Sequence, residues 1–459
     1  MRIWIDVEDF FVFAAKGGRR PTGIQRLAFE LCQEMRRLDT EGRIGFVRHD
    51  RLRDSLGVVA WDHVAALFSG LAEAAPAAPG ATPARPGIKS RLRAHFQPMV
   101  GRLPPDVVAP LVRMMKAQVE AVSAAADTVK ALLKRLRGGG HRAGPALVRG
   151  DTGAFAAAVQ PGDMLFIPGA GFVHTEYPAF IAGLRARHGL RVALLIYDII
   201  PVRRPEFVNL AFSESFGTWL DGMLPLCDRL MAISRSAAAE ATAHAVASGI
   251  PLRGEIQPIP IGTGFSGPAA AAAESHGLPA SGSYVLFVST MEPRKNHQLL
   301  LRVWRRLLES MPRAEVPILV FAGKRGPLSE DLVRELTSTR FLDGHIRLID
   351  QPSDGDLTAL YHGCLFTLFP SFYEGWGLPV TESLAFGKPC IISSATSLPE
   401  AGGTLARYFD PEDVPGATAL IRGVLEDRKG LAAWTRQVET EFRPVSWQES
   451  ARATLEHLA

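Results

Sequence analysis

The sequence predicts an α/β protein built from two doubly wound parallel-sheet domains. Its 459 residues are too many for one ordinary hydrophobic core, so we expect two domains. Short apolar runs alternate with amphipathic stretches along most of the chain, as in parallel sheets whose strands are buried between helices. The hydrophobic fraction of 47% supplies enough apolar material for two such cores.

The first domain is expected over residues 1–265. A helix is predicted over 22–35, because Leu27, Leu31 and Met35 recur every four residues and share one face. Ser234 is expected to cap another helix. The predicted strands of this domain are 2–7, 43–49, 164–169, 191–201 and 228–234, and the segment 256–264 is expected to close the domain.

An insertion over residues 70–150 interrupts this regular pattern. It begins with an Ala/Pro/Gly-rich stretch typical of flexible linkers. Residues 85–142 then carry twelve Lys and Arg against three Asp and Glu, a local charge of +9, with apolar residues at helical spacing. This segment is either a basic amphipathic helix on a membrane surface or a solvated helix packed on the domain.

The second domain is expected over residues 283–445, after an Ala/Gly/Ser/Pro-rich linker at 266–282. Its strands form one open parallel sheet covered on both faces. A last helix over 446–459 is expected to cross back to the first domain. The predicted strands are 284–290, 316–322, 346–350, 365–370 and 389–393.

Composition excludes several classes of protein. The net charge of +4 argues against a polycation that binds nucleic acid. The four cysteines are isolated in apolar stretches, so we expect them to be buried. No secretory signal or apolar run of about 18 residues is present. We therefore expect a cytoplasmic protein, peripheral on the inner face of the cytoplasmic membrane if the basic segment 85–142 binds lipid.

Two adjacent cations open a helix after the first strand of the second domain. Arg294 and Lys295 lie in the sequence Thr-Met-Glu-Pro-Arg-Lys-Asn-His. A helix N-terminus is itself positive, so two cations there are unfavourable unless an anion binds beside them. Arg294 is suited to hold a phosphate bidentately, and Lys295 supplies a point charge.

A glycine-rich loop with two carboxylates follows the fourth strand of the second domain. Gly375 and Gly377 allow the backbone to approach a ligand closely, and Pro379 fits a helix start. Glu374 lies in the loop and Glu382 about one turn into the helix. Two carboxylates over one pocket are suited to sugar or ribose hydroxyls, although Glu382 in a first turn also stabilises the helix dipole.

These motifs resemble those of glycosyltransferase family 4, which is retaining and has the GT-B fold of two Rossmann-like domains facing a cleft. The spacing of Glu374 and Glu382 matches the family's E-x7-E motif, and PRKN at 293–296 and SLPEAGG at 397–403 accompany it. The resemblance is closest to bacterial mannosyltransferases of polysaccharide biosynthesis. It is thinner in the first domain, at 22–26 and 197–207.

The resemblance implies a role for each matching residue. Arg294 and Lys295 would clamp the donor diphosphate, Glu374 the transferred sugar and Glu382 the ribose. The nucleotide base would lie near Lys324 and the loop 350–353. The catalytic candidates are Glu374, Lys295, Arg294 and Asp198. The donor-binding candidates are Gly23, Arg294, Lys295, Glu374, Gly375, Trp376, Gly377, Leu378 and Glu382.

One position departs from the family pattern. Many relatives have histidine before the Asp of the YDIIP segment, whereas this chain has Tyr197 before Asp198. A role for position 197 is therefore not carried over. Asp198 and Arg204 remain candidates at the interdomain cleft, and His174 is a weaker one.

No cofactor or metal is expected, only a nucleotide-sugar co-substrate. Asp354-Gly355-Asp356 matches a metal-binding DxD pattern, but Ser353 and Asp354 precede an amphipathic helix and fit a cap better. Arg294, Lys295 and a helix N-terminus would then offset the leaving-group charge. We expect attack on the leaving-group face with retention, the departing β-phosphate accepting the acceptor's proton.

The partners expected are a nucleotide-sugar donor, GDP-mannose first and UDP-sugars second, and a glycan or polyprenyl-diphosphate-linked acceptor. No nucleic acid is expected. Two alternatives stay open: a nucleotide-sugar epimerase on the same fold, and a non-catalytic nucleotide-binding subunit. Only Tyr197 favours the second alternative.

Overall fold

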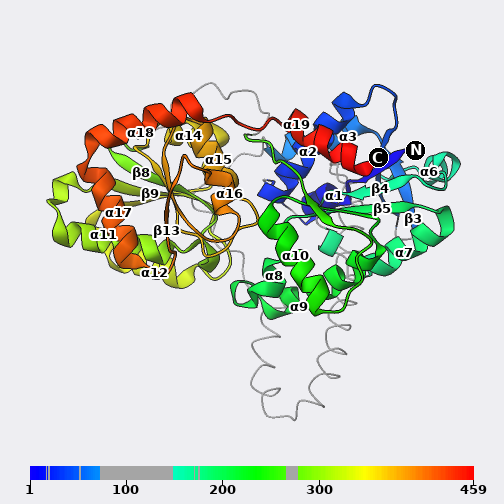
Figure 1. Ribbon diagram of the computed structural model, residues 1–459, viewed down its shortest axis with the longest axis horizontal. Helices are drawn as coiled ribbons and strands as arrows, with labels where there is room; N and C mark the ends of the chain where they lie inside the picture. The colour runs from blue at the N-terminus through cyan, green and yellow to red at the C-terminus, as the bar shows by residue number, and fades with distance from the viewer. Residues whose placement is uncertain are drawn as a thin grey trace, which may run out of the picture. The chain divides into compact units, whose positions relative to one another are not determined.

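The fold is described from a computed structural model (Figure 1). The structure describes residues 1–16, 18, 21–50, 53–72, 148–169, 171–173, 176–264 and 278–459. The basic segment 85–142, most of the insertion 70–150 and most of the linker 266–282 lie outside these ranges. The predictions made for those segments stay predictions.

The N-terminal half forms a seven-stranded sheet in the order β3-β2-β1-β4-β5-β6-β7. All neighbouring strands pair in parallel except β3, which is antiparallel to β2. The order reverses between β1 and β4, so the loops after these two strands flank the switch point. The strands are β1 Ile3–Asp6, β2 Ile44–Asp50, β3 Ser55–Val59, β4 Met164–Ile167, β5 Arg191–Ile196, β6 Arg229–Ala232 and β7 Ile256–Pro258.

Helices cover both faces of this sheet. One apolar cluster packs α1, α2, α3 and α19 on one face, and another packs α6, α7, α9 and α10 on the other. As predicted, Ser234 caps α10, accepting a hydrogen bond from the Ala237 N–H. The helices are α1 Glu8–Ala15, α2 Gly23–Leu38, α3 Trp61–Ala72, α6 Thr152–Ala158, α7 Tyr177–His188, α8 Ile200–Arg203, α9 Leu210–Met223 and α10 Arg235–Ala247.

The C-terminal half forms a six-stranded, wholly parallel sheet in the order β10-β9-β8-β11-β12-β13. Its order reverses between β8 and β11, which places the loops carrying both predicted motifs at one switch point. The strands are β8 Tyr284–Val288, β9 Ile318–Gly323, β10 Ile346–Asp350, β11 Thr367–Phe369, β12 Cys390–Ser393 and β13 Arg407–Phe409.

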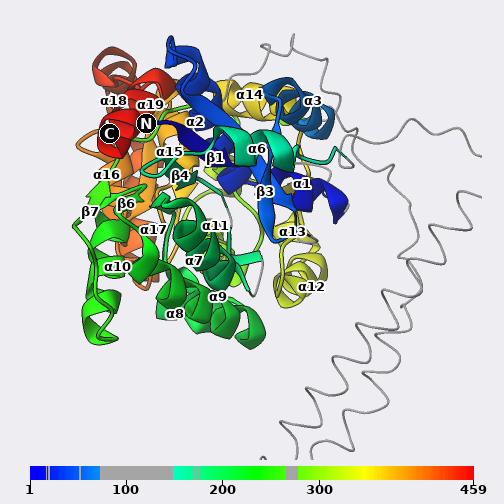
Figure 2. The same cartoon turned by 90° about the vertical axis from the view of Figure 1, so that its right-hand side faces the viewer.

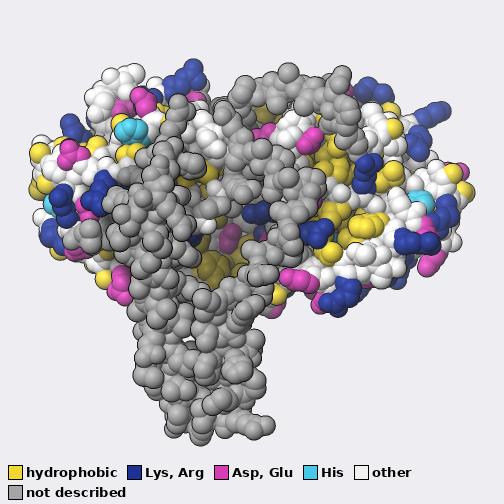
Figure 3. All heavy atoms as spheres, turned by 180° about the vertical axis from the view of Figure 1, so that it is seen from behind, with side chains coloured by type: hydrophobic (Ala, Val, Ile, Leu, Met, Phe, Trp, Pro, Cys, Tyr) yellow, Lys and Arg dark blue, Asp and Glu magenta, His cyan; other side chains and the backbone are white. Residues whose placement is uncertain are grey.

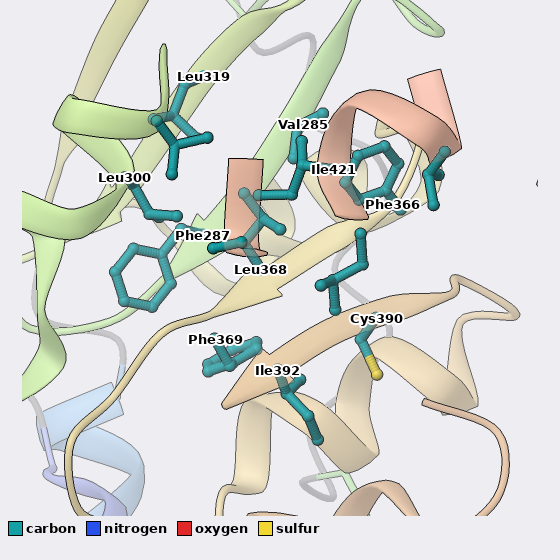
Figure 4. Packing of buried hydrophobic residues seen from close by; sticks show 14 of the residues in the cluster. Val285, Phe287, Leu300, Leu319, Phe366, Leu368, Phe369, Cys390, Ile392 and Ile421 are labelled. Carbon is teal, nitrogen blue, oxygen red and sulfur yellow. The ribbon is translucent and has the colours of Figure 1, made fainter. Parts of the chain in front are cut away.

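The core of the C-terminal sheet is built from fully buried apolar side chains that meet between strands and helices. Figure 4 shows Phe287, Phe369 and Ile392 converging there with the buried thiol of Cys390. The four cysteines are free and buried, as predicted. The helices are α11 His297–Ser310, α12 Glu330–Ser338, α13 Arg340–Asp343, α14 Asp354–Gly363, α15 Leu378–Ala385, α16 Leu398–Gly402, α17 Val414–Glu426, α18 Arg428–Glu441 and α19 Trp447–Leu458.

The last helix packs on the N-terminal sheet's helices. Helix α19 lies beside α2 in both ribbon views (Figures 1 and 2). The Trp447 indole N–H donates to the Gly264 carbonyl at 2.6 Å, and Ala451 is fully buried in the same cluster. The chain's final helix therefore contributes to the N-terminal core.

The predicted fold class is confirmed, but several element bounds were wrong. The strand predicted at 191–201 ends at Ile196, because Asp198 accepts a hydrogen bond from the Ile200 N–H and α8 begins there. Within the closing segment 256–264, Ile256–Pro258 forms strand β7. The sequence analysis also missed α1, β3 and the edge strand β13. On the face shown in Figure 3, the described basic and acidic side chains are interspersed.

Candidate active site

Asn296 joins the loops that follow β8 and β11. It has a left-handed backbone conformation, with φ of 56°, and its side chain caps α11 by accepting from the Leu299 N–H. Its amide nitrogen donates to the carbonyls of Pro370 at 3.0 Å and Pro411 at 2.9 Å. One buried amide therefore holds the Arg294–Lys295 loop against the segment that leads to Glu374.

The two loops converge on the Glu374 carboxylate. Arg294 donates from Nη1 to Oε2 at 2.8 Å, and Lys295 donates from Nζ to Oε1 at 2.5 Å. Arg294 also donates to the Tyr373 carbonyl and, through Nη2, to Glu292 at 2.8 Å. The structure thus brings together three of the predicted catalytic residues, although Glu374 lies 79 and 80 positions from the two cations in the sequence.

For Glu374 and for Lys295, burial and the oppositely charged partner shift the pKa in opposite directions. Burial raises the pKa of Glu374, but Arg294 and Lys295 outweigh burial and bring that pKa down to about 2. Burial lowers the pKa of Lys295, and the neighbouring Arg294 lowers it further while Glu374 opposes both. The pair of cations is therefore compensated by carboxylates within the described part of the site.

Hydroxyl groups from the loop after β12 fix the Glu374 backbone. The Glu374 N–H donates to Thr396 Oγ1 at 2.9 Å, and Thr396 Oγ1 and Ser397 Oγ both donate to the Glu374 carbonyl. Ser397 also donates to the Trp376 carbonyl at 3.0 Å. Hydrogen bonds to its main chain thus fix the position of Glu374. The carboxylate is the part of Glu374 that contacts Arg294 and Lys295.

Gly375 lies where the N-terminal half approaches the loop that follows β11. A Cβ atom at Gly375 would lie 2.4 Å from the Tyr197 carbonyl oxygen and 3.3 Å from Asp198 Oδ2. Burial raises the pKa of Asp198, whereas Arg294 lowers it. Only glycine leaves room for this approach, and it places Asp198 close to the charged cluster.

Gly377, Leu378 and Trp376 form the start of α15. Gly377 has φ of 114° and occupies the N-cap position, so the helix begins one residue before Pro379. The Trp376 indole N–H is buried and has no partner in the described structure. This loop therefore carries a buried indole donor two residues after Glu374.

Gly23 was predicted on a loop that directly follows the first strand, but the structure does not place it there. Helix α1 intervenes, and Gly23 is the first residue of α2. A Cβ atom on Gly23 would lie 3.8 Å from Leu378 Cδ1. Gly23 therefore lies close to the Leu378 side chain at the start of α15.

Glu382 is held by a different partner from Glu374. The Tyr361 hydroxyl donates to Glu382 Oε2 at 2.9 Å, and burial raises the pKa of Glu382 despite that bond. Near it, Arg26 pairs with Asp354 at 2.9 Å. Of the two acids of the E-x7-E spacing, only Glu374 contacts the cations.

The DxD residues have structural partners. Ser353 is the N-cap of α14, as predicted, and Asp356 completes a capping box by accepting from the Ser353 N–H at 2.8 Å. In the described ranges, no group of three or more His, Cys, Asp or Glu side chains is placed to hold a metal ion.

The region expected to hold the nucleotide base adjoins the first loop. The Met291 N–H donates to the Lys324 carbonyl at 2.9 Å, and the Gln351 N–H donates to the Gly323 carbonyl. These bonds join the ends of β8, β9 and β10. The assignment of Lys324 and residues 350–353 to the base stays a prediction.

The sequence analysis selected Arg204 and missed its neighbours. Arg204 pairs locally with Glu206 at 2.5 Å. Burial raises the pKa of Glu240, whereas the charge of Arg203 lowers it. The Tyr373 hydroxyl donates a hydrogen bond to the same carboxylate. Glu240 lies mid-helix in an alanine-rich run and had no sequence signal. His174 lies outside the described residues.

Two doubly wound sheets, with a cation pair and a glutamate at the switch point of the second, correspond to the GT-B fold. Residues 270–440 match the family model described as glycosyl transferases group 1. The match covers less than half of the chain, and this part resembles glycosyl transferases of that group.

Comparisons with known proteins agree with this class. The chain is 35% identical over 172 residues to O-antigen chain mannosyltransferase B of Escherichia coli, covering 38% of this chain and 44% of the relative. It is 28% identical over 284 residues to the serotype-specific mannosyltransferase WbdA of Escherichia coli, covering 59% of this chain and 34% of the relative. The chain thus spans less than half the length of either relative. The predicted resemblance to bacterial polysaccharide mannosyltransferases is confirmed.

A solved structure supports the fold over both halves. The α,α-trehalose-phosphate synthase of Burkholderia xenovorans aligns with a TM-score of 0.51 and 15% identity, over 66% of this chain and 74% of that one. Among the described residues, no helix is long and apolar enough to cross a membrane.

Proposed function

We propose that this protein is a retaining glycosyltransferase of family 4 that transfers a hexosyl group from a nucleotide-sugar to an acceptor in surface polysaccharide assembly. The observation that carries this proposal is the meeting of Arg294 and Lys295 with Glu374 at one switch point. Open α/β sheets bind ligands at such points, and paired cations there suit a diphosphate. Mannose is the first candidate sugar, since both Escherichia coli relatives are named mannosyltransferases.

The site's residues have distinct proposed roles. Arg294 and Lys295 neutralise the donor diphosphate, and Lys295 offsets the charge that develops on the leaving group. Glu374 and the backbone N–H groups around Gly375 contact the transferred sugar. Asp198, which lies close to Gly375, is proposed to face the acceptor hydroxyl.

Glu382 is proposed to bind the ribose hydroxyls. Tyr361 donates to one of its oxygens, which leaves the second oxygen to accept from a diol. Trp376 adds a buried N–H without a protein partner, suited to a sugar or phosphate oxygen.

We propose that transfer proceeds with retention and without a metal ion. The acceptor hydroxyl attacks the anomeric carbon on the face of the departing diphosphate, forming the new C–O bond as the old one breaks. The acceptor's proton moves to the β-phosphate oxygen that leaves. Transfer that is insensitive to EDTA and yields a product with the donor's anomeric configuration by NMR would support this mechanism.

The acceptor is proposed to be a glycan or a polyprenyl-diphosphate-linked sugar. The second choice depends on the basic segment 85–142, whose charge suits anionic lipid. Flotation with phosphatidylglycerol vesicles, comparing the full chain with one lacking residues 85–142, tests it. Equal flotation of both proteins would remove the membrane interpretation.

The donor can be identified by a thermal-shift panel of nucleotide diphosphates and their sugars. A ligand at 100 times its Kd stabilises the folded state by about 2.7 kcal/mol, which is readily measured. We expect GDP-mannose to give the largest shift. Incubating that donor with and without a glycan acceptor separates transfer from epimerisation, because an epimerase converts the donor alone. Absence of a shift with every nucleotide would contradict the proposed function.

A further inference from the structure

Glu374 occupies the cations that the proposed donor diphosphate needs. Its two carboxylate oxygens accept from Arg294 and Lys295 at 2.8 and 2.5 Å, so that both cations are engaged by Glu374. The Glu374 side chain is 9% exposed. A diphosphate entering the site therefore competes with this carboxylate for the same donors.

The competition can be resolved by the side chain alone. Thr396 and Ser397 hold the Glu374 N–H and carbonyl, so the backbone stays in place while the carboxylate turns away from the cations. A buried carboxylate that leaves its partners without finding new ones is strongly destabilised. The free energy of this exchange therefore depends on what Glu374 contacts afterwards.

The transferred sugar decides that outcome. A nucleotide-sugar brings hydroxyl donors next to Gly375 and Glu374, and these can replace the lost cation contacts. A nucleotide diphosphate brings the same two phosphates but no sugar, so the displaced carboxylate loses both cations and gains no sugar hydroxyl in exchange. The free-energy cost of displacing Glu374 is thus large when the nucleotide diphosphate binds. When the nucleotide-sugar binds, its sugar hydroxyls largely offset that cost.

We infer that Glu374 is a specificity-determining residue that selects nucleotide-sugar over nucleotide diphosphate by returning to Arg294 and Lys295 when no sugar is present. This inference rests on the proposed function, because it assumes that the two cations bind the diphosphate. It assigns Glu374 a role in expelling the product in addition to its proposed contact with the sugar.

The test is the ratio of two dissociation constants in a Glu374→Gln variant. Isothermal titration calorimetry would measure GDP and GDP-mannose, with UDP and UDP-glucose as a second pair, on the full chain without acceptor. The variant should bind the diphosphate tighter by roughly tenfold, the effect of removing one charge-assisted competitor. Binding of the nucleotide-sugar should gain less, so that preference for the sugar-bearing ligand falls.

Glu292→Gln is a matched control. Glu292 also accepts from Arg294, at 2.8 Å, and it raises the pKa of Lys295 through its charge. Removing its charge should tighten both ligands by a similar factor and leave their ratio unchanged. Glu374→Asp, whose carboxylate is drawn back from the cations by one methylene group, should move the ratio in the same direction as Glu374→Gln.

The outcomes separate this inference from the proposed function. Damage to the fold would weaken binding of both ligands, whereas the inference requires tighter diphosphate binding. Diphosphate affinity that is unchanged or weaker in Glu374→Gln overturns the inference, even where the wild-type protein transfers sugar. Absence of any nucleotide binding by the wild-type protein overturns both.

Discussion

Substituting Lys295 by alanine is the most direct test of the proposed chemistry. Its ammonium group lies 2.5 Å from Glu374 and its side chain is 14% exposed, so its charge acts in a largely water-excluded site. Removing one preorganised donor from a developing oxyanion lowers kcat by about 10²- to 10³-fold, or about 3–4 kcal/mol. We expect Lys295→Ala to show a loss of that size.

The loss should appear in kcat as well as in donor affinity. The diphosphate gains negative charge as the glycosidic bond breaks, so Lys295 stabilises the transition state more than the ground state. A coupled assay of nucleotide diphosphate release, at saturating and at limiting donor, separates kcat from kcat/KM. Lys295→Met, which keeps the side chain's apolar length, should behave like Lys295→Ala.

The control for this experiment is Lys429→Ala. Lys429 is an exposed lysine of α18 in the same half of the chain, so its loss should leave turnover within about twofold of the wild type, as expected of a surface substitution. Unfolding midpoints of both variants would check that the fold is intact. Turnover by folded Lys295→Ala within about threefold of the wild type would refute the argument, because the charge would then not stabilise the leaving group.

Three further predictions concern the site's supporting structure. Asn296→Ala removes two hydrogen bonds, a helix cap and a residue type that tolerates a φ of 56°. Urea unfolding should therefore show a free energy of unfolding lower by about 3 kcal/mol. Asn296→Gly should lose less, because glycine adopts this φ readily. Burial lowers the pKa of His297 from 6.5 to about 3, so only the unfolded state takes up a proton between these values, and stability should fall by about 1.4 kcal/mol per pH unit on acidification below 6.5. His297→Leu should remove that component of the slope; an unchanged slope would contradict the pKa argument. Gly375→Ala would place a Cβ atom 2.4 Å from the Tyr197 carbonyl, so turnover should drop by about tenfold or more, whereas Gly423→Ala, with open space around it, should not change turnover.

Doubly wound topology made much of the site predictable from sequence. Once the strands before Arg294 and Glu374 were identified, their carboxyl ends had to meet at the sheet's switch point. The observed contact between these side chains follows from that rule together with the buried amide of Asn296. Ser353 and Ser234 were likewise identifiable as caps from their residue type and position.

Other features depend on tertiary contacts that local sequence does not encode. Helix α1 has acids in its first turn, and its buried Phe10 and Phe11 leave no clear helical period, so it was missed. From sequence, Glu240 resembles a solvated helix residue, and only the structure shows that Tyr373 donates to it. Tyr361 lies in an amphipathic stretch, and only the structure shows that its hydroxyl holds Glu382.

The pairing of Glu374 with the two cations also has a general physical reason. Arg294 and Lys295 are largely buried, and buried charges are tolerated only when they are paired. A site that concentrates positive charge for a diphosphate would be unstable without its ligand unless it supplied its own counter-anion. The residue best placed to serve is one whose carboxylate the bound substrate can satisfy in another way. Glu374 meets this condition if the transferred sugar contacts it, so one side chain can both stabilise the empty site and distinguish the donor from the product.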